Sequence, residues 1–457
     1  MTVGVLERLR NELGDRVDTD PAALEEARAD KSGQRSPGAP LAVVHASDVA
    51  DVQATLRIAS ATATPVVTRG AGTGLAGGAN AGPGEIALSV RGMTRILDVR
   101  PDDLLAVVEP GIVNADLNAV LAERGLWWAP DPASRAISTV GGNIATGAGG
   151  LLCAKYGVVR DAVLGVDIVL ADGRLLSLGH RSVKGVTGLD LTSLVIGSEG
   201  TLGVIVRATL KLRRLVPGAP CTVAATFPDV RTAAAASSAV TAAGLQPAIM
   251  ELMDATSLEA VHRLLALPMP TPGAAQLTIQ TDGPAADVEA DAIAAVLAAN
   301  GGTVSLTHDP VEGERLLAVR RSFHPAMERL GTTLIEDVAV PRSGLAEMFD
   351  EIARIERDHG VEIPTVAHAG DGNLHPNFVF DAPADGEVPA KIWEAADDLF
   401  RAALRLGGTL TGEHGVGLLK RRWLAEELGD DQWRLQREIT RVFDPQGILN
   451  PGKVFAP

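Results

Sequence analysis

The chain has 457 residues, of which 46% are hydrophobic and 21% charged, a composition typical of a globular protein with roughly three domains. The net charge of −16, with no run of Lys and Arg, excludes a nucleic-acid partner on electrostatic grounds. There are two cysteines, Cys153 and Cys221, no signal-peptide core and no apolar stretch of ~18 residues, which predicts a cytoplasmic protein without disulfides or a transmembrane segment.

The first half of the chain switches irregularly between helical and strand-like patterns. The expected elements are a helix marked by Leu6, Leu9 and Leu13, a helix capped by Asp48, strands at 65–68, 86–90 and 105–109, a helix at 114–124, a hairpin turning at Asp172-Gly173, and a β-rich run to Leu212. This mixed order favours an α+β domain over a regularly alternating parallel sheet.

The composition changes at residues 216–220, where Val-Pro-Gly-Ala-Pro predicts a linker. Beyond it we expect strands at 222–227, 276–281 and 303–307, helices at 229–243 and 285–299, and a Pro-rich loop at 268–273. These strand–helix–strand units predict a second domain with helices packed on a sheet. The segment 444–453 is too rich in Pro and Gly for a helix, and we expect it to lie across the surface of an earlier element.

A glycine-rich loop occupies residues 69–78, directly after a predicted strand. Glycines let backbone amides approach a ligand closely, and successive inward amides form a nest suited to phosphate. The loop lacks the Gly-Lys-Ser/Thr of a P-loop, and the alternation of Gly70, Gly72 and Gly74 fits the dinucleotide fingerprint poorly. Taken alone, the loop could also be an ordinary turn.

Further segments at 130–150, 183–191 and 197–205 are equally dense in small and hydroxylated residues. Such residues would let a large planar cofactor and its diphosphate lie against the backbone. A core that only needed filling would use more Leu, Ile and Phe.

Three of the nine histidines fall in two short Gly-containing segments, 368–375 and 412–415, which we expect to form turns. His368, His375 and Glu413 have the ligand types of a catalytic zinc site with one open position, and His414 would remain as an acid or base beside the metal. The alternative is that these histidines cap turns or bond within a core, because their spacing is not that of a helical ligand pair.

Together these segments resemble the FAD-linked oxidases of the vanillyl-alcohol oxidase and p-cresol methylhydroxylase superfamily. They are most similar to the D-2-hydroxyacid dehydrogenase branch, which includes D-lactate dehydrogenases, D-2-hydroxyglutarate dehydrogenases and the flavin subunit of glycolate oxidase. The resemblance implies an α+β fold of the p-cresol methylhydroxylase type. Its expected parts are an N-terminal helical segment at 1–39, a two-subdomain FAD-binding domain at 40–216, an α+β cap domain at 217–410, and a C-terminal segment at 411–457 that returns to the flavin.

By this resemblance, the first glycine loop binds the FAD pyrophosphate and later segments line the flavin. The implied cofactor-binding residues are Arg69, Gly70, Ala71, Gly72, Thr73, Gly74, Leu75, Pro130, Ser134, Gly141, Gly142, Asn143, Thr146, Glu199, Gly203, Ile205 and Asn450. Some members of the superfamily tether FAD through a histidine in the first loop. No histidine occurs between His45 and His180, so we expect non-covalent FAD.

The resemblance also assigns the histidine segments. It makes His368, His375 and Glu413 the ligands of a divalent metal, with zinc the first choice, and His414 the catalytic base. A metal on the substrate's hydroxyl and carboxylate lowers the hydroxyl pKa, and the C2 hydride then leaves for flavin N5 as the base takes the proton. Asn377 matches a substrate-contacting residue.

Substrate choice depends on three positions in the cap domain. Arg320 aligns with a family arginine that anchors a substrate carboxylate, whereas Arg321 is expected in a surface ion pair. His324 and Ile335 occupy the positions where D-2-hydroxyglutarate enzymes place a threonine and a lysine for the distal carboxylate. The missing lysine favours a D-lactate-like or glycolate-like acid, with D-2-hydroxyglutarate as the alternative.

Two hypotheses from other classes stay open. One is a metallohydrolase that binds a substrate phosphate on the glycine loops, and the other is a flavin subunit acting mainly within a multisubunit redox complex. Because the chain has no cysteine cluster, the electron acceptor must lie outside it: a quinone, an electron-transfer flavoprotein or an iron–sulfur partner. A homodimer, and a peripheral place at the inner face of a membrane through a partner, are compatible with the sequence.

Overall fold

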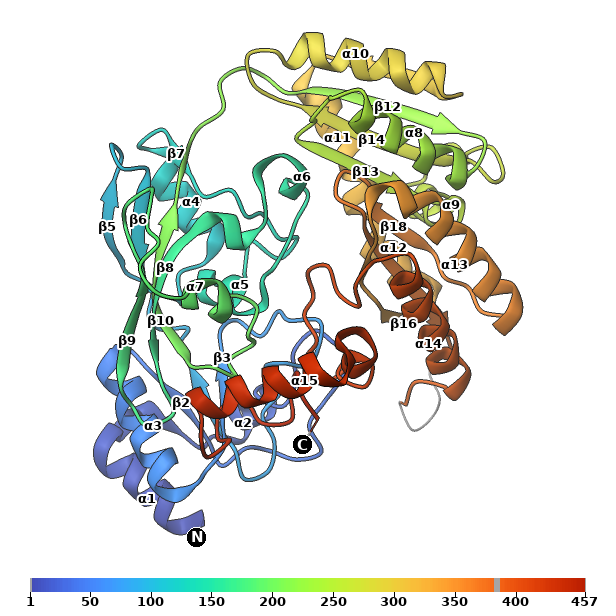
Figure 1. The fold of residues 1–457 in the computed structure, drawn as a ribbon. Helices are drawn as coiled ribbons and strands as arrows, with labels where there is room; N and C mark the ends of the chain where they lie inside the picture. Colours follow the sequence, from blue (N-terminus) through green and yellow to red (C-terminus); the bar gives the residue numbers. More distant parts are fainter. Residues whose placement is uncertain (1, 382–386, 457) are drawn as a thin grey trace. The chain divides into compact units, whose positions relative to one another are not determined.

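The computed structural model describes residues 2–381 and 387–456, and the chain divides into two compact units (Figure 1). Unit 1 comprises Met1–Gly150, Gly157–Leu215 and Glu413–Pro457, and unit 2 comprises Leu151–Tyr156 and Val216–Gly412. Most of unit 2 is therefore inserted between two parts of unit 1. Both units combine helices with sheets, which confirms the predicted α+β class.

Unit 1 contains a small sheet whose strand order is β1-β2-β4-β3. Its strands are β1 (Val17–Asp18), β2 (Ala42–His45), β3 (Val66–Arg69) and β4 (Ile86–Ser89), with β2 and β3 both parallel to β4. The helices α1 (Thr2–Leu13) and α3 (Val49–Thr62) pack against each other and bury one hydrophobic cluster with this sheet; α2 (Pro21–Glu26) precedes β2. The glycine-rich loop follows β3 directly.

The second sheet of unit 1 is antiparallel, with the order β5-β6-β10-β8-β9. Its strands are β5 (Ile96–Arg100), β6 (Leu105–Val108), β8 (Val163–Val169), β9 (Leu175–Gly179) and β10 (Val204–Lys211), and β7 (Leu126–Trp127) pairs separately with β11 (Arg213–Arg214). The helices α4 (Asn114–Ala122), α5 (Val140–Thr146) and α7 (Leu191–Val195) accompany it, while α6 (Cys153–Tyr156) belongs to unit 2. A cluster around Trp128, Ile144 and Ile168 forms the core of this sheet.

The C-terminal part of unit 1 is α15 (Leu424–Phe443), broken at Gly429, followed by an extended segment. As expected, this segment forms no helix and lies against an earlier element, and its Ile448 and Leu449 are buried. Val66 N donates to Ile448 O at 2.7 Å and Asn450 N donates to Val66 O at 2.8 Å, so the segment runs beside β3. The apolar pair in this Pro/Gly-rich stretch draws the chain into the core.

Unit 2 is built on one antiparallel sheet with the order β15-β12-β14-β13-β18-β19-β16, and β17 also pairs with β19. Its strands are β12 (Cys221–Phe227), β13 (Ile249–Met253), β14 (Ala275–Thr281), β15 (Thr303–Thr307), β16 (Thr332–Ile335), β17 (Val338–Ala339), β18 (Thr365–His368) and β19 (Asn373–Phe380). One group of helices that pack on one another is α8 (Val230–Ala242), α10 (Ala286–Ala299), α13 (Leu345–His359) and α14 (Ala390–Arg405). A second group is α9 (Ala255–Leu264), α11 (Pro310–Arg321) and α12 (Phe323–Leu330).

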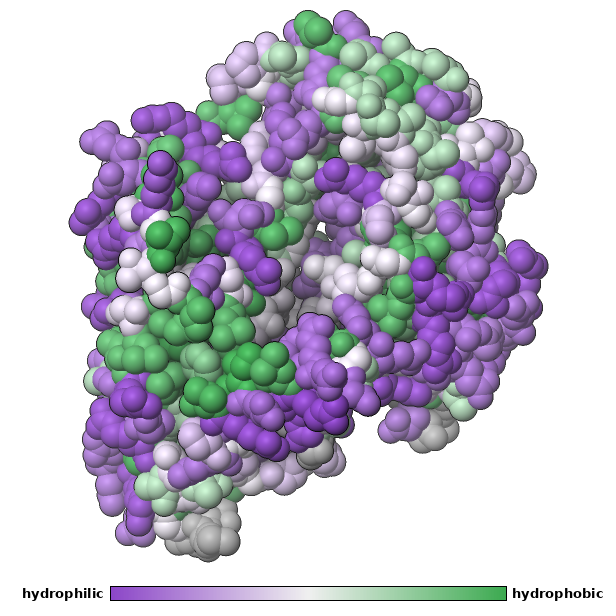
Figure 2. Space-filling view, in the orientation of Figure 1, coloured by the Kyte–Doolittle hydropathy of each residue, from purple (hydrophilic) through white to green (hydrophobic). Residues whose placement is uncertain are grey.

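The helices α13 and α14 of unit 2 are amphipathic. Phe349 and Ile352 of α13 and Leu399 of α14 are buried, whereas the outer surface of these two helices is mostly hydrophilic (Figure 2). None of the helices in the described part of the chain is long and apolar enough to cross a membrane.

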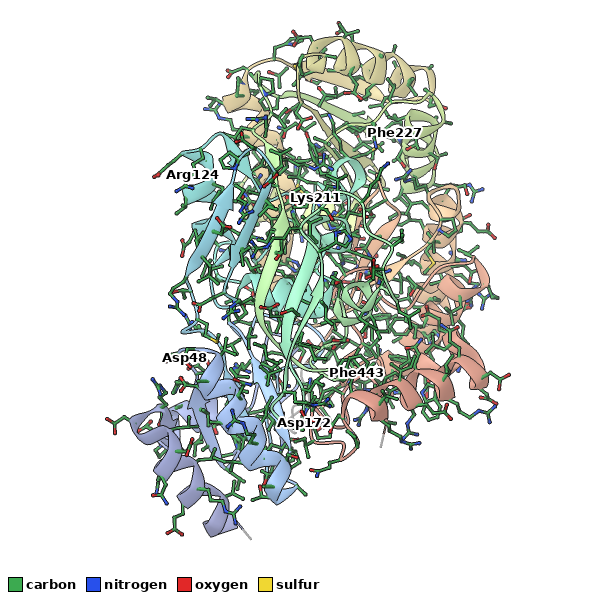
Figure 3. All side chains as sticks on the ribbon, turned by 60° about the vertical axis from the view of Figure 1, so that its left-hand side comes forward. Asp48, Arg124, Asp172, Lys211, Phe227 and Phe443 are labelled. Atoms are coloured by element: carbon green, nitrogen blue, oxygen red, sulfur yellow. The ribbon has the colours of Figure 1, made fainter. Side chains whose placement is uncertain are left out.

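Local signals predicted many of these elements correctly. Asp48 caps α3, since its Oδ1 accepts from Asp51 N at 3.0 Å, and Asp172 stands in the turn between β8 and β9 (Figure 3). The predicted strand ending at Phe227 is β12, and the predicted helices at 229–243 and 285–299 are α8 and α10. The predicted hairpin needs Gly173, whose φ of +85° lies in the left-handed region.

Candidate functional site

One face of the unit 2 sheet gathers polar side chains from three neighbouring strands. In the register of the strands, Glu251 of β13 lies opposite His368 of β18, and His368 lies opposite Asn373 of β19. Opposite residues share a face, and side chains alternate along a strand, so His375 and Asn377 follow Asn373 on the same face. The expectation that these histidines sit in turns is wrong: His368 ends β18, His375 lies within β19, and only residues 369–372 make the turn.

Glu251 holds His368 in a fixed orientation. The His368 Nδ1 lies 2.6 Å from Glu251 Oε1, and the Glu251 side chain is 1% exposed. A buried carboxylate on Nδ1 favours the tautomer with its proton there, which leaves Nε2 as a lone-pair donor. This carboxylate–imidazole pair is the arrangement that supports metal-binding histidines in proteins.

A second buried carboxylate, Asp337, lies beside the other histidine. Asp337 Oδ1 is 3.9 Å from His375 Nδ1 and accepts from Asn373 Nδ2 at 2.6 Å, while its Oδ2 accepts from Thr411 Oγ1 at 2.6 Å. The two imidazole rings stand edge to face with centroids 5.0 Å apart. Unit 2 thus presents two buried histidines, each with a buried carboxylate nearby, and the carboxylate of Glu251 is within hydrogen-bond distance of His368.

The last residue of unit 2 is constrained by the same network. A Cβ on Gly412 would lie 2.3 Å from Asn373 Nδ2, so only glycine fits here. Glu413 and His414 follow in the chain and belong to unit 1, where both are half-buried and Glu413 Oε1 lies 3.9 Å from His414 Nε2. Chain connectivity therefore keeps both residues within one or two peptide units of the network around Asp337.

Glu199 anchors the segment that follows His414. Its Oε1 accepts from Val416 N at 2.7 Å and its Oε2 from Gly417 N at 2.9 Å. Burial raises the pKa of the Glu199 carboxyl to about 7, against the lowering effect of these two amides. The structure thus uses this predicted flavin-contacting side chain to position the loop that starts at Glu413.

Arg320, a residue of α11, lies beside Glu251 of β13. Its Nε is 2.8 Å from Glu251 Oε2, a charge contact without hydrogen-bond alignment, and the side chain is 10% exposed. Among the described residues its two Nη atoms have no carboxylate partner, which leaves them able to pair with a ligand carboxylate. Sequence analysis missed Glu251, although an acid inside the apolar run 249–253 is a signal for a buried functional group.

The remaining predicted substrate positions differ in their surroundings. Asn377 is fully buried; its Nδ2 donates to His375 O at 2.9 Å, and its Oδ1 has no hydrogen-bond partner among the described residues. Ile335 of β16 lies opposite Asn377 of β19 and is half-buried. His324 is exposed near the start of α12.

The glycine-rich loop in unit 1 offers free backbone donors. Within the described part of the chain, none of the amides of residues 70–78 donates a hydrogen bond, although the loop is at least half-buried, whereas the Ala79 amide bonds the Asp30 carboxyl. Gly72 and Gly77 have φ values of +68° and +79°. A half-buried run of free amides fits an anionic group such as a diphosphate.

Arg69 fixes this loop from behind. Its guanidinium donates to the carbonyl oxygens of Glu26, Ala29 and Ala79 at 2.7–3.1 Å. These three contacts hold the guanidinium against the backbone of the loop and of the segment before β2.

Other predicted cofactor residues line segments next to this loop or the core. The helix α5, which Thr139 caps through Gly142 N, carries Gly141, Gly142, Asn143 and Thr146. The loop before α5 contains Pro130 and Ser134. Gly203 precedes β10, and Ile205 of that strand is buried in the core. Asn450 Nδ2 donates to Gly78 O at 2.9 Å and to Glu199 O at 2.6 Å. Its side chain thereby joins the glycine loop to the Glu199 turn, and its buried Oδ1 has no hydrogen-bond partner among the described residues.

Comparison with known families gives two matches that together span most of the chain. Residues 40–179 match the FAD binding domain, and residues 216–454 match the C-terminal domain of FAD linked oxidases. The chain is 39% identical over 422 residues to the glycolate oxidase subunit GlcD of Bacillus subtilis, covering 91% of this chain and 89% of that protein. It is 34% identical over 414 residues to a D-lactate dehydrogenase of Archaeoglobus fulgidus, covering 90% of each.

Solved structures share the fold. The structure of p-cresol methylhydroxylase with bound substrate matches with a TM-score of 0.79 at 17% identity, covering 99% of this chain and 97% of that one. An alkyldihydroxyacetonephosphate synthase matches with a TM-score of 0.75 at 19% identity, covering 98% of this chain and 85% of that one.

Proposed function

Because the chain belongs to the family of FAD-linked oxidases, we propose that it oxidises a D-2-hydroxyacid to the 2-oxoacid with FAD and a divalent metal, zinc being the first choice. The family match confirms the resemblance seen in the sequence and supports an oxidoreductase acting on CH–OH groups. The observation that carries the metal-assisted part is the polar face of unit 2, where Glu251 orients His368 and Asp337 lies behind His375.

The donor set on this face fits a borderline-soft divalent metal. His368 and His375 would supply imidazole nitrogens and Glu413 a carboxylate oxygen, a three-ligand set that leaves a position open for substrate. When bound, the metal would polarise the substrate hydroxyl and the flavin would accept the hydride. His414, next to Glu413 in the chain, would take the hydroxyl proton at an imidazole nitrogen.

Arg320 and Asn377 would bind the substrate's polar groups. The Arg320 Nη atoms suit the C1 carboxylate, and the buried Asn377 Oδ1 needs a donor that a hydroxyl can supply. Because Glu251 lies between Arg320 and His368, binding of the substrate carboxylate by Arg320 would be coupled to the orientation of His368 as a metal ligand.

FAD would bind non-covalently to unit 1. The free amides of residues 70–78 fit its pyrophosphate, and no histidine from 46 to 179 could tether it.

The substrate would carry a single carboxylate. Ile335 places an apolar side chain opposite Asn377, where the dicarboxylate enzymes of the family would need a cation. The relatives named as a glycolate oxidase subunit and as D-lactate dehydrogenases support a glycolate-like or D-lactate-like acid. The "subunit" in the first name supports an electron acceptor on another chain.

Anaerobic reduction of the bound flavin tests this proposal. Purified protein would be mixed with D- and L-lactate, glycolate and D-2-hydroxyglutarate, before and after metal chelation, and flavin bleaching recorded. We expect bleaching by D-lactate or glycolate that chelation abolishes and added zinc restores. A bound flavin that no 2-hydroxyacid bleaches would refute the substrate class, and bleaching that survives complete metal removal would refute the metal's role.

A further inference from the structure

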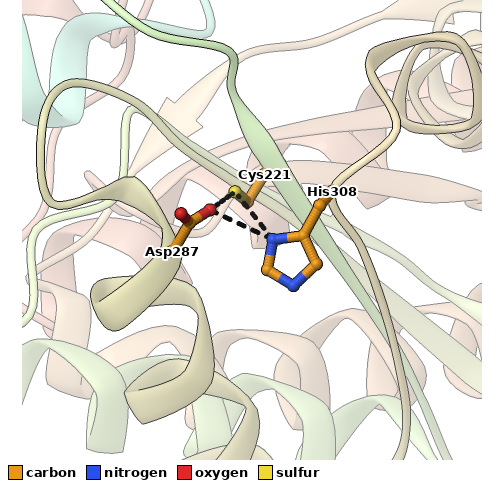
Figure 4. A group of neighbouring side chains, drawn as sticks. All are labelled: Cys221, Asp287 and His308. Carbon is orange, nitrogen blue, oxygen red and sulfur yellow. Dashed lines mark hydrogen bonds and ion pairs between the residues drawn. The ribbon is translucent and has the colours of Figure 1, made fainter.

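We propose that Cys221, Asp287 and His308 form a second divalent-metal site in unit 2, separate from the histidine site described above. The three side chains converge from different elements (Figure 4). Cys221 begins β12, Asp287 lies in the first turn of α10, and His308 directly follows β15. β12 is separated from β13, which carries Glu251, by β14.

The fold brings these residues together through strand pairing. Thr222 of β12 lies opposite Thr307 of β15, so the next residues outward on the two antiparallel strands, Cys221 and His308, come side by side. α10 packs on β12 and β15, and its first turn brings Asp287 to the same place. No large side-chain movement is needed to assemble the trio.

The distances between the ligand atoms fit a small tetrahedral ion. Cys221 Sγ is 2.9 Å from Asp287 Oδ1 and 3.4 Å from His308 Nδ1, and the last two atoms are 3.1 Å apart. Zinc bonds of ~2.3 Å to sulfur and ~2.0 Å to nitrogen or oxygen separate tetrahedral ligands by roughly 3.3–3.6 Å. An opening of a few tenths of an ångström would therefore admit the ion.

The ligand types and their exposure indicate which ion binds. Thiolate, imidazole and carboxylate together select zinc or cobalt over magnesium or calcium, which prefer oxygen ligands alone. Cys221 is 2% exposed, whereas the side chains of Asp287 and His308 are 75% and 55% exposed. The ion would thus enter from solvent, bind the buried sulfur last and keep water at its fourth position.

Binding would clamp three elements of unit 2 at one edge of its sheet. Because Cys221 lies 66 positions before Asp287 and 87 before His308, an ion shared among them ties β12 to α10 and β15 and stabilises the folded state without acting on the flavin or substrate. The site is therefore structural or regulatory rather than catalytic.

Cobalt binding offers a test whose optical signal requires a thiolate ligand. The chain has only two cysteines, and the proposed catalytic ligands include none, so a thiolate-to-cobalt charge-transfer band requires Cys221 or Cys153. Chelated flavoprotein would be titrated with Co²⁺ while this near-ultraviolet band and the melting temperature are followed. We expect a saturable band and a rise in melting temperature. Excess Zn²⁺ should remove the band but keep the higher melting temperature.

Matched variants decide the outcome. Cys221→Ser should abolish the band, and Cys153→Ser should leave it intact. The substitutions Asp287→Asn and His308→Ala, at exposed ligands, should weaken cobalt binding by roughly tenfold or more. His308→Ala should also retain oxidation of the 2-hydroxyacid. Absence of a band in the unmodified protein, its persistence in Cys221→Ser, or its loss in Cys153→Ser would overturn the proposal.

Discussion

At the scale of single residues, Glu251 is the side chain on which the candidate active site most depends. It is buried between Arg320 and His368 and contacts both. Removing its charge would leave Arg320 buried beside a neutral group and release His368 from its fixed tautomer. The residue therefore acts through its neighbours and is a positioning residue.

The substitution Glu251→Gln tests this role. We expect divalent-metal affinity to fall by about 10- to 100-fold, because outer partners of metal-binding histidines contribute that much. Metal affinity would be measured by competition with a chromophoric chelator, which does not depend on turnover. Glu312→Gln, an exposed change on α11, is the control; equal metal affinity in the two variants would contradict the prediction.

Ile335 tests the substrate class at the same scale. Since it lies opposite Asn377, Ile335→Lys would place an ammonium group where a distal carboxylate could pair with it. A charged hydrogen bond of about 1.5–3 kcal/mol corresponds to a roughly 10- to 100-fold gain in the kcat/KM ratio for D-2-hydroxyglutarate over D-lactate. Thr333→Lys, two residues away on the same strand, serves as the comparison. An unchanged ratio in Ile335→Lys would show that this strand does not face the substrate.

At the scale of elements, sequence patterns predicted what local signals determine. α3, α8, α10 and the hairpin at Asp172-Gly173 follow from capping residues, helical periodicity and turn chemistry. The strands that carry the candidate site were not predicted. In β19 the polar residues 373, 375 and 377 alternate with apolar residues 374, 376 and 378, which is the period of a strand with one polar face, but the internal Pro376 and the preceding Gly370 and Gly372 favour a turn.

The candidate site residues were nevertheless found before the elements that hold them. Residue type made His368, His375, Glu413 and His414 candidates, and the resemblance to the D-2-hydroxyacid dehydrogenase branch assigned their roles. The supporting carboxylates could not be assigned, since the pairing of Glu251 with His368 spans 117 positions and depends on the tertiary order of β13 and β18. Patterns along a chain do not specify such long-range register.

The C-terminal segment gives a prediction about elements. Asn450 ties the glycine loop and the Glu199 turn together, and its φ of +44° is unusual for a residue other than glycine. Asn450→Gly keeps that backbone conformation but removes two hydrogen bonds, so we expect the free energy of unfolding to fall by about 2 kcal/mol, together with weaker FAD retention. Urea unfolding and flavin release on dilution measure the two effects. The exposed Asn300→Gly is the control, and if it loses as much flavin, the role of the Asn450 amide is refuted.

At the scale of the whole molecule, the buried Glu199 and the half-buried Asp254 make stability depend on pH. Burial raises the pKa of both Glu199 and Asp254 to about 7. Asp254 caps α9, accepting from Ser257 N at 2.8 Å, and also accepts from Thr365 N at 2.7 Å. An acid whose folded pKa is raised binds its proton more tightly in the native state, so stability is greatest at low pH and falls as pH rises from the unfolded value of 3.8 through about 7.

The contribution of Asp254 can be isolated between pH 5 and pH 8. With a folded pKa of about 7, this carboxyl should lower the free energy of unfolding by on the order of 2–3 kcal/mol across that interval. Asp254→Asn keeps the cap acceptor but cannot ionise, so its stability should decline less over the same interval, as measured by urea unfolding at fixed ionic strength. Asp229→Asn makes the same change at the exposed cap of α8 and should decline as the unmodified protein does. If Asp254→Asn and Asp229→Asn lose stability in parallel between pH 5 and pH 8, the pH dependence arises from groups other than Asp254. The Asp254 carboxyl would then have the same protonation state in the folded and the unfolded protein.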